Sequence, residues 1–111
     1  MSGGASTQRT WRWDALHGTI LFAALSILDF LPLDHEMRKW MAHDIGVLEN
    51  VNHGDIDSMR DVSQDIYSQS FQVITICLNQ RGAFKMQVWL PVLQDHQVML
   101  AYALRYLREN S

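Results

Sequence analysis

The chain has 111 residues, of which 48% are hydrophobic and 19% charged, and its formal net charge is -3 at pH 7. This length fits one domain, and this composition is globular rather than disordered. The slight excess of acidic residues gives no general attraction to nucleic acid or anionic membranes, so such binding would need a local basic patch. A single cysteine, Cys77, excludes an intramolecular disulfide and a cysteine-based zinc site.

Residues 1–9 are mostly small and polar, and we expect them to form a flexible tail before a single helical domain over residues 10–111. The tail lacks the basic and then apolar pattern of a secretory signal, so we expect a cytoplasmic protein. The most apolar stretch, residues 19–28, is about half as long as a membrane span requires. We therefore expect this stretch to be a core helix.

The first predicted helix covers residues 11–29, because Thr10 can cap it and the Leu31-Pro32 step ends it. Of the 21 residues from 11 to 31, 14 are apolar, and the polar ones recur at Arg12, Thr19 and Ser26. A bundle helix needs an apolar face of about three positions in seven, so this helix has a surplus. Either other helices surround it or its spare face meets a second copy, and we expect a homodimer.

The second predicted helix covers residues 35–48, with Asp34 as its N-cap. Its predicted core stripe has the spacing of one helix face and comprises Met37, Trp40, Met41, Ile45 and Leu48. The segment 49–54 contains asparagine, histidine and glycine, which predicts a loop.

The third predicted helix begins near Asp55 or Asp57 and continues to Asn79, although residues 71–90 also allow a short β-hairpin. The hairpin is suggested by β-branched residues before the turn-forming sequence that contains Gly82. Polar residues recur in steps of three and four, at Asp57, Asp61, Gln64, Ser68, Gln72, Thr75 and Asn79. This recurrence is typical of a helix and favours it over the hairpin.

The fourth predicted helix covers residues 91–109, or begins near Met86 with a kink at Pro91. Its expected polar stripe is Gln94, Gln97, Arg105 and Arg108. Four helices joined by short loops predict an all-α fold, a four-helix bundle-like single domain. The alternative is an α+β fold with the hairpin at about 71–90.

Charge is distributed unevenly along the chain. Between residues 44 and 65, a single Arg60 is accompanied by six acids, which are Asp44, Glu49, Asp55, Asp57, Asp61 and Asp65. Between residues 81 and 108, a single Asp95 is accompanied by four bases, which are Arg81, Lys85, Arg105 and Arg108. Such asymmetry can steer a basic partner onto the acidic face, or it can be an ordinary solvated surface.

His17 and His96 are expected on the core faces of the first and fourth helices, where two imidazoles could hold a metal or haem. The Glu-x-x-His pairs of carboxylate bundle sites are missing from the sequence, and so are His-x-x-x-His pairs. Each imidazole tip could instead reach a carbonyl or the surface. A helical metal- or haem-binding protein is therefore the alternative function.

Trp11 and Trp13 lie two positions apart at the start of the first helix, so they cannot face the same direction. At least one is therefore expected at an edge or an interface, where tryptophan is enriched. The sequence contains no nucleophile-elbow motif and no glycine-rich phosphate loop. We predict a non-enzymatic protein-interaction module (a regulator, inhibitor or adaptor) with no cofactor and no direct nucleic-acid contact, which binds a basic partner through its acidic face.

Overall fold

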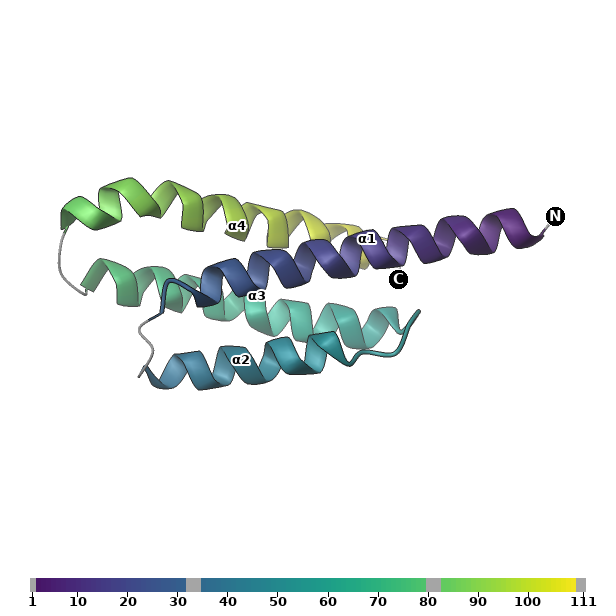
Figure 1. Ribbon diagram of the computed structural model, residues 1–111, viewed down its shortest axis with the longest axis horizontal. Coiled ribbons are helices and arrows are strands. Elements are labelled where there is room, and N and C mark those ends of the chain that lie inside the picture. The colour runs from purple at the N-terminus through teal and green to yellow at the C-terminus, as the bar shows by residue number, and fades with distance from the viewer. Residues whose placement is uncertain (1, 32–34, 80–82, 110–111) are drawn as a thin grey trace.

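A computed structural model describes the backbone of residues 2–31, 35–79 and 83–109, and the side chains of 12–31, 35–79 and 89–109. Four helices follow one another along the chain: α1 Ser2–Leu28, α2 Glu36–Glu49, α3 Ile56–Asn79 and α4 Ala83–Glu109. Each helix runs opposite to the one before it (Figure 1). The predicted all-α, bundle-like fold is confirmed. The alternative hairpin at 71–90 is wrong, because the described parts of that range are helical.

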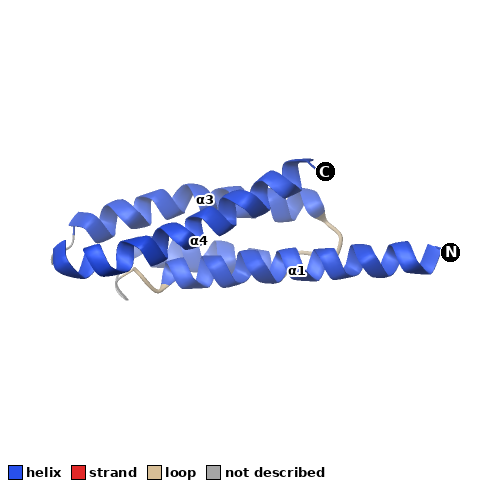
Figure 2. Ribbon diagram, turned by 90° about the horizontal axis from the view of Figure 1, so that it is seen from above, coloured by secondary structure: helices blue, strands red, loops and turns tan. Residues whose placement is uncertain are grey.

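The helices pack as a four-sided bundle. Helix α1 contacts both α2 and α4, and α3 also contacts both of them. Figure 2 shows α3 and α4 side by side, as these contacts require. Large side chains that are shielded from solvent fill the space between the helices, among them Ile20, Ile27, Met41, Leu48, Met59, Ile66, Leu93 and Leu100. Burying one such side chain stabilises the fold by about 1.5–3 kcal/mol compared with leaving it exposed to water.

Helix α1 begins at Ser2, whereas the sequence predicted a tail over residues 1–9 and a helix start at Trp11. The first turns of α1 project beyond the other three helices (Figure 1). Small residues such as Ala5 and Ser6 permit a helix, and residues 2–10 contain no proline that would end one. The described backbone therefore differs from the expected tail in its conformation.

Side-chain hydrogen bonds cap the start of α2 and the end of α1. The His35 side chain accepts a hydrogen bond from the Met37 amide at 3.1 Å and caps α2, while the predicted cap Asp34 lies outside the described residues. Arg38 Nη1 donates to the carbonyls of Leu28 and Leu31, at 3.0 and 3.1 Å. Arg38 thus places a positive charge at the negative end of α1, which fixes α2 against it.

The predicted polar row of α3 is confirmed as its outward side, since the row's members are exposed or half-buried. The opposite side of the helix buries Met59, Ile66 and Val73.

Helix α4 begins at Ala83 and contains Pro91, so the earlier of the two predicted starts is nearer to the structure. Among the described residues, no helix has both the length and the apolar character needed to cross a bilayer.

Two predicted side-chain positions are wrong. Trp40 is 57% exposed rather than in the core, because Met37, Met41 and Ile45 set the buried side of α2 and Trp40 lies about 100° around the helix from Met41. Gln97 is only 8% exposed, although it was assigned to the polar stripe of α4. Its amide nitrogen donates to Ser70 Oγ at 2.8 Å, and this partner allows its burial.

Candidate functional site

Three of the predicted acidic residues form a row on the outward side of α3. Asp57, Asp61 and Asp65 lie four positions apart and are exposed, with 78% of the Asp57 side chain and 77% of the Asp61 side chain accessible. Arg60 lies between the first two, 3.2 Å from Asp57 and 3.7 Å from Asp61. We call Asp57, Asp61 and Asp65 the acidic row.

The stability of α3 does not account for the acidic row. Like charges four positions apart destabilise a helix by about 0.2–0.5 kcal/mol per pair. Asp57 lies in the first turn, where a carboxylate complements the helix dipole, but Asp61 and Asp65 lie beyond that turn. Arg60 offsets part of the repulsion. The row therefore leaves accessible negative charge on the surface at a small cost to the helix.

The remaining predicted acids have other surroundings. Asp44 is half-buried and accepts a hydrogen bond from Gln69 Nε2 at 2.7 Å, which joins α2 to α3. Glu49 is exposed at the last position of α2. Asp55 precedes α3 and accepts from Ser58 Oγ at 2.7 Å and from the Ser58 amide at 3.1 Å. Asp44 and Asp55 are thus engaged by neighbouring polar groups, whereas Glu49, like the three members of the acidic row, is exposed.

The two hydrogen bonds to Asp55 also affect its protonation. The bond from the Ser58 hydroxyl, followed by the bond from the Ser58 amide, lowers the pKa of Asp55 below its ordinary value. Gly54, just before it, has a φ of 88°, which other residues rarely adopt. The turn into α3 is therefore held in a defined geometry with a carboxylate at its start.

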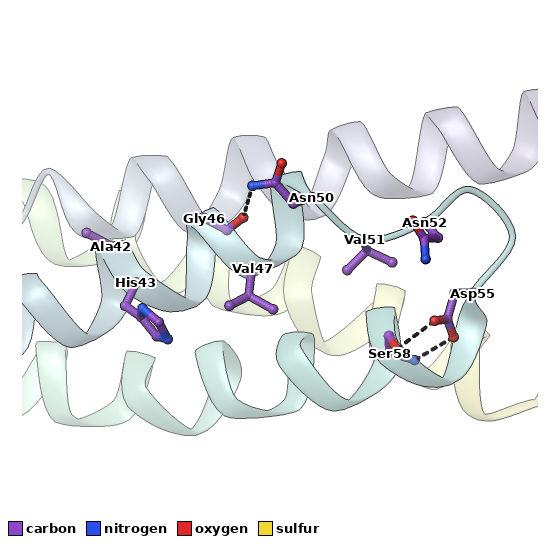
Figure 3. Close-up of a pocket in the computed structure, with 9 residues that line it drawn as sticks. All are labelled: Ala42, His43, Gly46, Val47, Asn50, Val51, Asn52, Asp55 and Ser58. Atoms are coloured by element: carbon purple, nitrogen blue, oxygen red, sulfur yellow. Dashed lines mark hydrogen bonds between the residues drawn. The ribbon is translucent and has the colours of Figure 1, made fainter.

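A shallow hollow of about 600 Å³ lies where α2 ends and α3 begins (Figure 3). Figure 3 shows Val47 and Val51 on the side of α2 and its following loop that faces Asp55 and Ser58. Polar groups surround this apolar pair; the lining residues are Ala42, His43, Gly46, Val47, Asn50, Val51, Asn52, Asp55 and Ser58. The hollow could receive a side chain with an apolar stem and a polar head.

The two histidines of the predicted pair, His17 on α1 and His96 on α4, have different neighbours in the structure. His17 Nε2 lies 2.6 Å from the Leu48 carbonyl oxygen near the end of α2, so His17 is directed toward α2. His96 Nδ1 lies 2.7 Å from the Val92 carbonyl oxygen, and its ring is 5.6 Å from that of Phe22 on the α4 side of α1. Within the described residues, no three His, Cys, Asp or Glu side chains are grouped as metal ligands would be.

Trp13 is buried at 9% exposure and joins α1 to the loop after α2. Its ring stacks on His17 at 6.1 Å and lies 5.3 Å from the ring of His53, whose Nε2 is 3.5 Å from Asp14. The side chain of Trp11 lies outside the described residues. Trp13 is therefore packed inside the protein, and it is Trp40 and Trp89 that are exposed, at 57% and 53%.

The predicted basic residues are described in part. Arg105 pairs with Glu109 at 3.1 Å, and Arg108 donates to Gln64 Oε1 on α3. Arg81 and the Lys85 side chain lie outside the described residues.

The thiol of Cys77 donates to the Phe30 carbonyl at 3.2 Å, and burial raises the pKa of Cys77, which keeps the thiol protonated and unreactive at neutral pH.

Sequence reasoning missed the exposed apolar residues of α4. Val98 and Tyr102 are 51% and 68% exposed and lie one turn apart, away from the buried Leu100 and Leu104. Their four-residue spacing outside the core stripe was the available signal.

Comparison of the chain with models of known protein families, with curated proteins and with solved structures finds no match.

Proposed function

We propose that this chain is a small non-enzymatic protein-interaction module, a regulator, inhibitor or adaptor, that binds a basic protein through the acidic row of α3. The observation that carries the proposal is the exposure of Asp57 and Asp61, at 78% and 77%, on a helix that gains little from their charge. Negative charges arranged in this way steer a positively charged partner and set its orientation.

The hollow at the start of α3, the helix that carries the acidic row, supports the same function. Lysine and arginine carry long apolar stems that lie along apolar surface while the charged head remains hydrated. Val47, which is 44% exposed, and Val51 can contact such a stem, with the Asp55 carboxylate nearby for the head. A basic segment that follows α3 would therefore meet both charge and apolar surface.

The test is affinity capture with mass spectrometry, comparing the native chain with the Asp57→Asn, Asp61→Asn, Asp65→Asn triple variant. The triple variant should lose the basic proteins that the native chain retains, because it lacks the charges that attract them. It should keep the helical circular dichroism, since all three side chains are exposed.

A matched control removes the same amount of charge elsewhere. Asp14, Asp29 and Glu36 are exposed and lie on neither α3 nor α4, so Asp14→Asn, Asp29→Asn and Glu36→Gln together should leave capture intact. Equal capture by both triple variants, or equal loss in both, would contradict a role for the acidic row. The first result would leave no role for charge, and the second would indicate only a dependence on net charge.

We further propose that the protein acts in the cytoplasm as a homodimer. An unpaired cysteine is typical of a reducing compartment, where Cys77 would stay a thiol. The support for a dimer is the exposure of large apolar side chains on α1 and α4, such as Phe22 at 60% and Tyr102 at 68%. Monomeric proteins seldom leave such residues in contiguous patches.

A further inference from the structure

The outer surface along α4 and its seam with α1 carries exposed apolar side chains. Val98 and Tyr102 are 51% and 68% exposed, and Tyr106, one turn further on, is 39% exposed. Val92 is 38% exposed, and Phe22, at 60%, reaches α4 through its ring contact with His96. We call the residues Phe22, Val92, Val98, Tyr102 and Tyr106 the α4 outer face.

We propose that a second copy of this chain covers the α4 outer face, with the two α4 helices antiparallel about a two-fold axis level with Leu100. This assignment rests on the homodimer proposed above. It places the contact mainly on α4, with Phe22 at the seam, because α1 already buries Ile20, Ala23, Ala24 and Ile27 within one copy. Part of the apolar surplus that the sequence shows in α1 is thus covered by the other three helices, while Phe22 and Leu25 remain exposed.

The exposed apolar area is close to what an interface of ordinary size needs. With roughly 200 Å² for an aromatic side chain, the exposed parts of Phe22, Tyr102 and Tyr106 amount to about 330 Å². Val92 and Val98 bring the total to roughly 400 Å² or more. A standard interface buries about 800 Å² on each partner, of which about 60% is apolar. The α4 outer face therefore supplies most of the apolar part.

Charge along α4 favours the antiparallel arrangement and a second copy as the occupant. Asp95 and Arg105 are both exposed, and they lie equally far from Leu100 on opposite sides of it. An antiparallel two-fold pair places Asp95 of one copy level with Arg105 of the other, and it also places Val98 level with the second copy's Tyr102. A parallel pair would place Asp95 level with Asp95. In the antiparallel pair, Arg105 would be shared between Glu109 of its own copy and Asp95 of the second copy.

The first test measures association. Sedimentation velocity and light scattering, from about 1 to about 100 µM, should show a dimer for the native chain. Val98→Ser with Tyr102→Ser should raise the dissociation constant at least about tenfold, because two exposed apolar contacts are lost on each copy. The matched control is Phe71→Ser with Leu78→Ser, which removes similarly exposed apolar side chains, at 51% and 54%, from α3 and should leave the dimer unchanged.

The possible results separate the assigned face from the dimer itself. A native chain that is monomeric at the highest concentration would overturn both. A native dimer that survives Val98→Ser with Tyr102→Ser, or one that the α3 control dissociates equally, would overturn the assignment to α4 and leave the dimer standing. The acidic row is tested by capture and is unaffected by either result.

The second test fixes the direction of the two helices. Copies carrying Val98→Cys are mixed with copies carrying Tyr102→Cys and oxidised mildly, and the disulfide products are identified by intact mass. The antiparallel pair predicts mainly the mixed disulfide, since only level positions approach within about 7 Å between Cα atoms. Cys77 is buried at 7% exposure, so the native chain serves as the uncrosslinked control. Mainly self-paired disulfides, or none, would overturn the proposed arrangement.

Discussion

Asp55 shows how one local contact couples protonation to the start of a helix. Its carboxylate accepts hydrogen bonds from the hydroxyl and the amide of Ser58, and these bonds stabilise the charged form. The folded pKa of Asp55 therefore lies below its unfolded value of 3.8. A carboxyl group with a depressed pKa stabilises the fold above the unfolded pKa, and this contribution is lost as the pH falls through the folded pKa.

Replacing Ser58 with alanine should raise the pKa of Asp55 part of the way toward 3.8, because the stronger bond is lost while the amide bond remains. Carbon-detected NMR titration of the Asp55 carboxyl group measures this directly. As the pH falls below about 4, the free energy of unfolding should also decrease less in the variant than in the native chain. The reason is that the folded and unfolded pKa values of Asp55 differ less in the variant. Ser68→Ala, at an exposed hydroxyl further along α3, is the control, and an unchanged Asp55 pKa in Ser58→Ala would contradict the capping role.

Residue identity alone could not show which histidines and tryptophans are buried. His17 and His96 were both predicted on core faces, and both do approach backbone carbonyls, as the alternative to metal binding expected. Trp40 fits an apolar helical stripe and is nevertheless exposed. The difference depends on which neighbouring helix covers an edge of the stripe, and this is a property of the assembled bundle rather than of the stripe itself.

At the scale of elements, the hydrogen bond between Ser70 and Gln97 joins α3 to α4 inside the core. Ser70 is fully buried, and its hydroxyl donates to the Tyr67 carbonyl at 2.5 Å while it accepts from Gln97. A buried donor that loses its partner costs about 1–3 kcal/mol. The pair therefore favours one register of α3 against α4, because sliding either helix would leave the amide unsatisfied.

Ser70→Ala should lower the free energy of unfolding by about 1–3 kcal/mol, because the Gln97 amide is left buried without its partner. Urea denaturation followed by circular dichroism measures the change. Adding Gln97→Leu should recover part of the loss, since the orphaned amide is removed as well. Thr75→Ala is the matched control, because that exposed hydroxyl also donates to a carbonyl of its own helix, and it should cost little. Equal losses for Ser70→Ala and Thr75→Ala would rule out the interhelical role.

Helix existence was the most predictable property of this chain, and helix boundaries were less so. The polar recurrence through α3 correctly predicted one continuous helix. One side of this helix faces solvent along its whole length, so polar residues recur there at the helical period. Gln97 was misassigned, since a buried polar residue depends on a partner such as Ser70 from another helix. Of the proposed site, Asp57 and Asp61 belong to the same recurrence, whereas the exposure of Asp65 and the surroundings of the remaining acids required the fold.

At the scale of the whole molecule, α1 differs from the other helices in its length beyond the bundle. Its first turns project past α2, α3 and α4 (Figure 1). A helix shorter than about 12–15 residues is marginal in water without tertiary packing. Among the described side chains of α1, Trp13 is the first that is buried, and it contacts His17 and His53. Residues 2–9 should therefore contribute helical content without contributing much to the stability of the fold.

Deleting residues 2–9 should change the free energy of unfolding by less than about 0.5 kcal/mol, because the backbone of this segment projects past the other three helices (Figure 1). The helical circular dichroism should fall only by the share of the residues removed. Trp13→Ala, by contrast, should cost about 3–5 kcal/mol, because a buried aromatic side chain leaves a cavity. Urea titrations of both variants at several protein concentrations make the comparison. A concentration-dependent loss after the deletion would mean that a second copy holds this segment, and the contact surface would then have to include the start of α1 as well as α4.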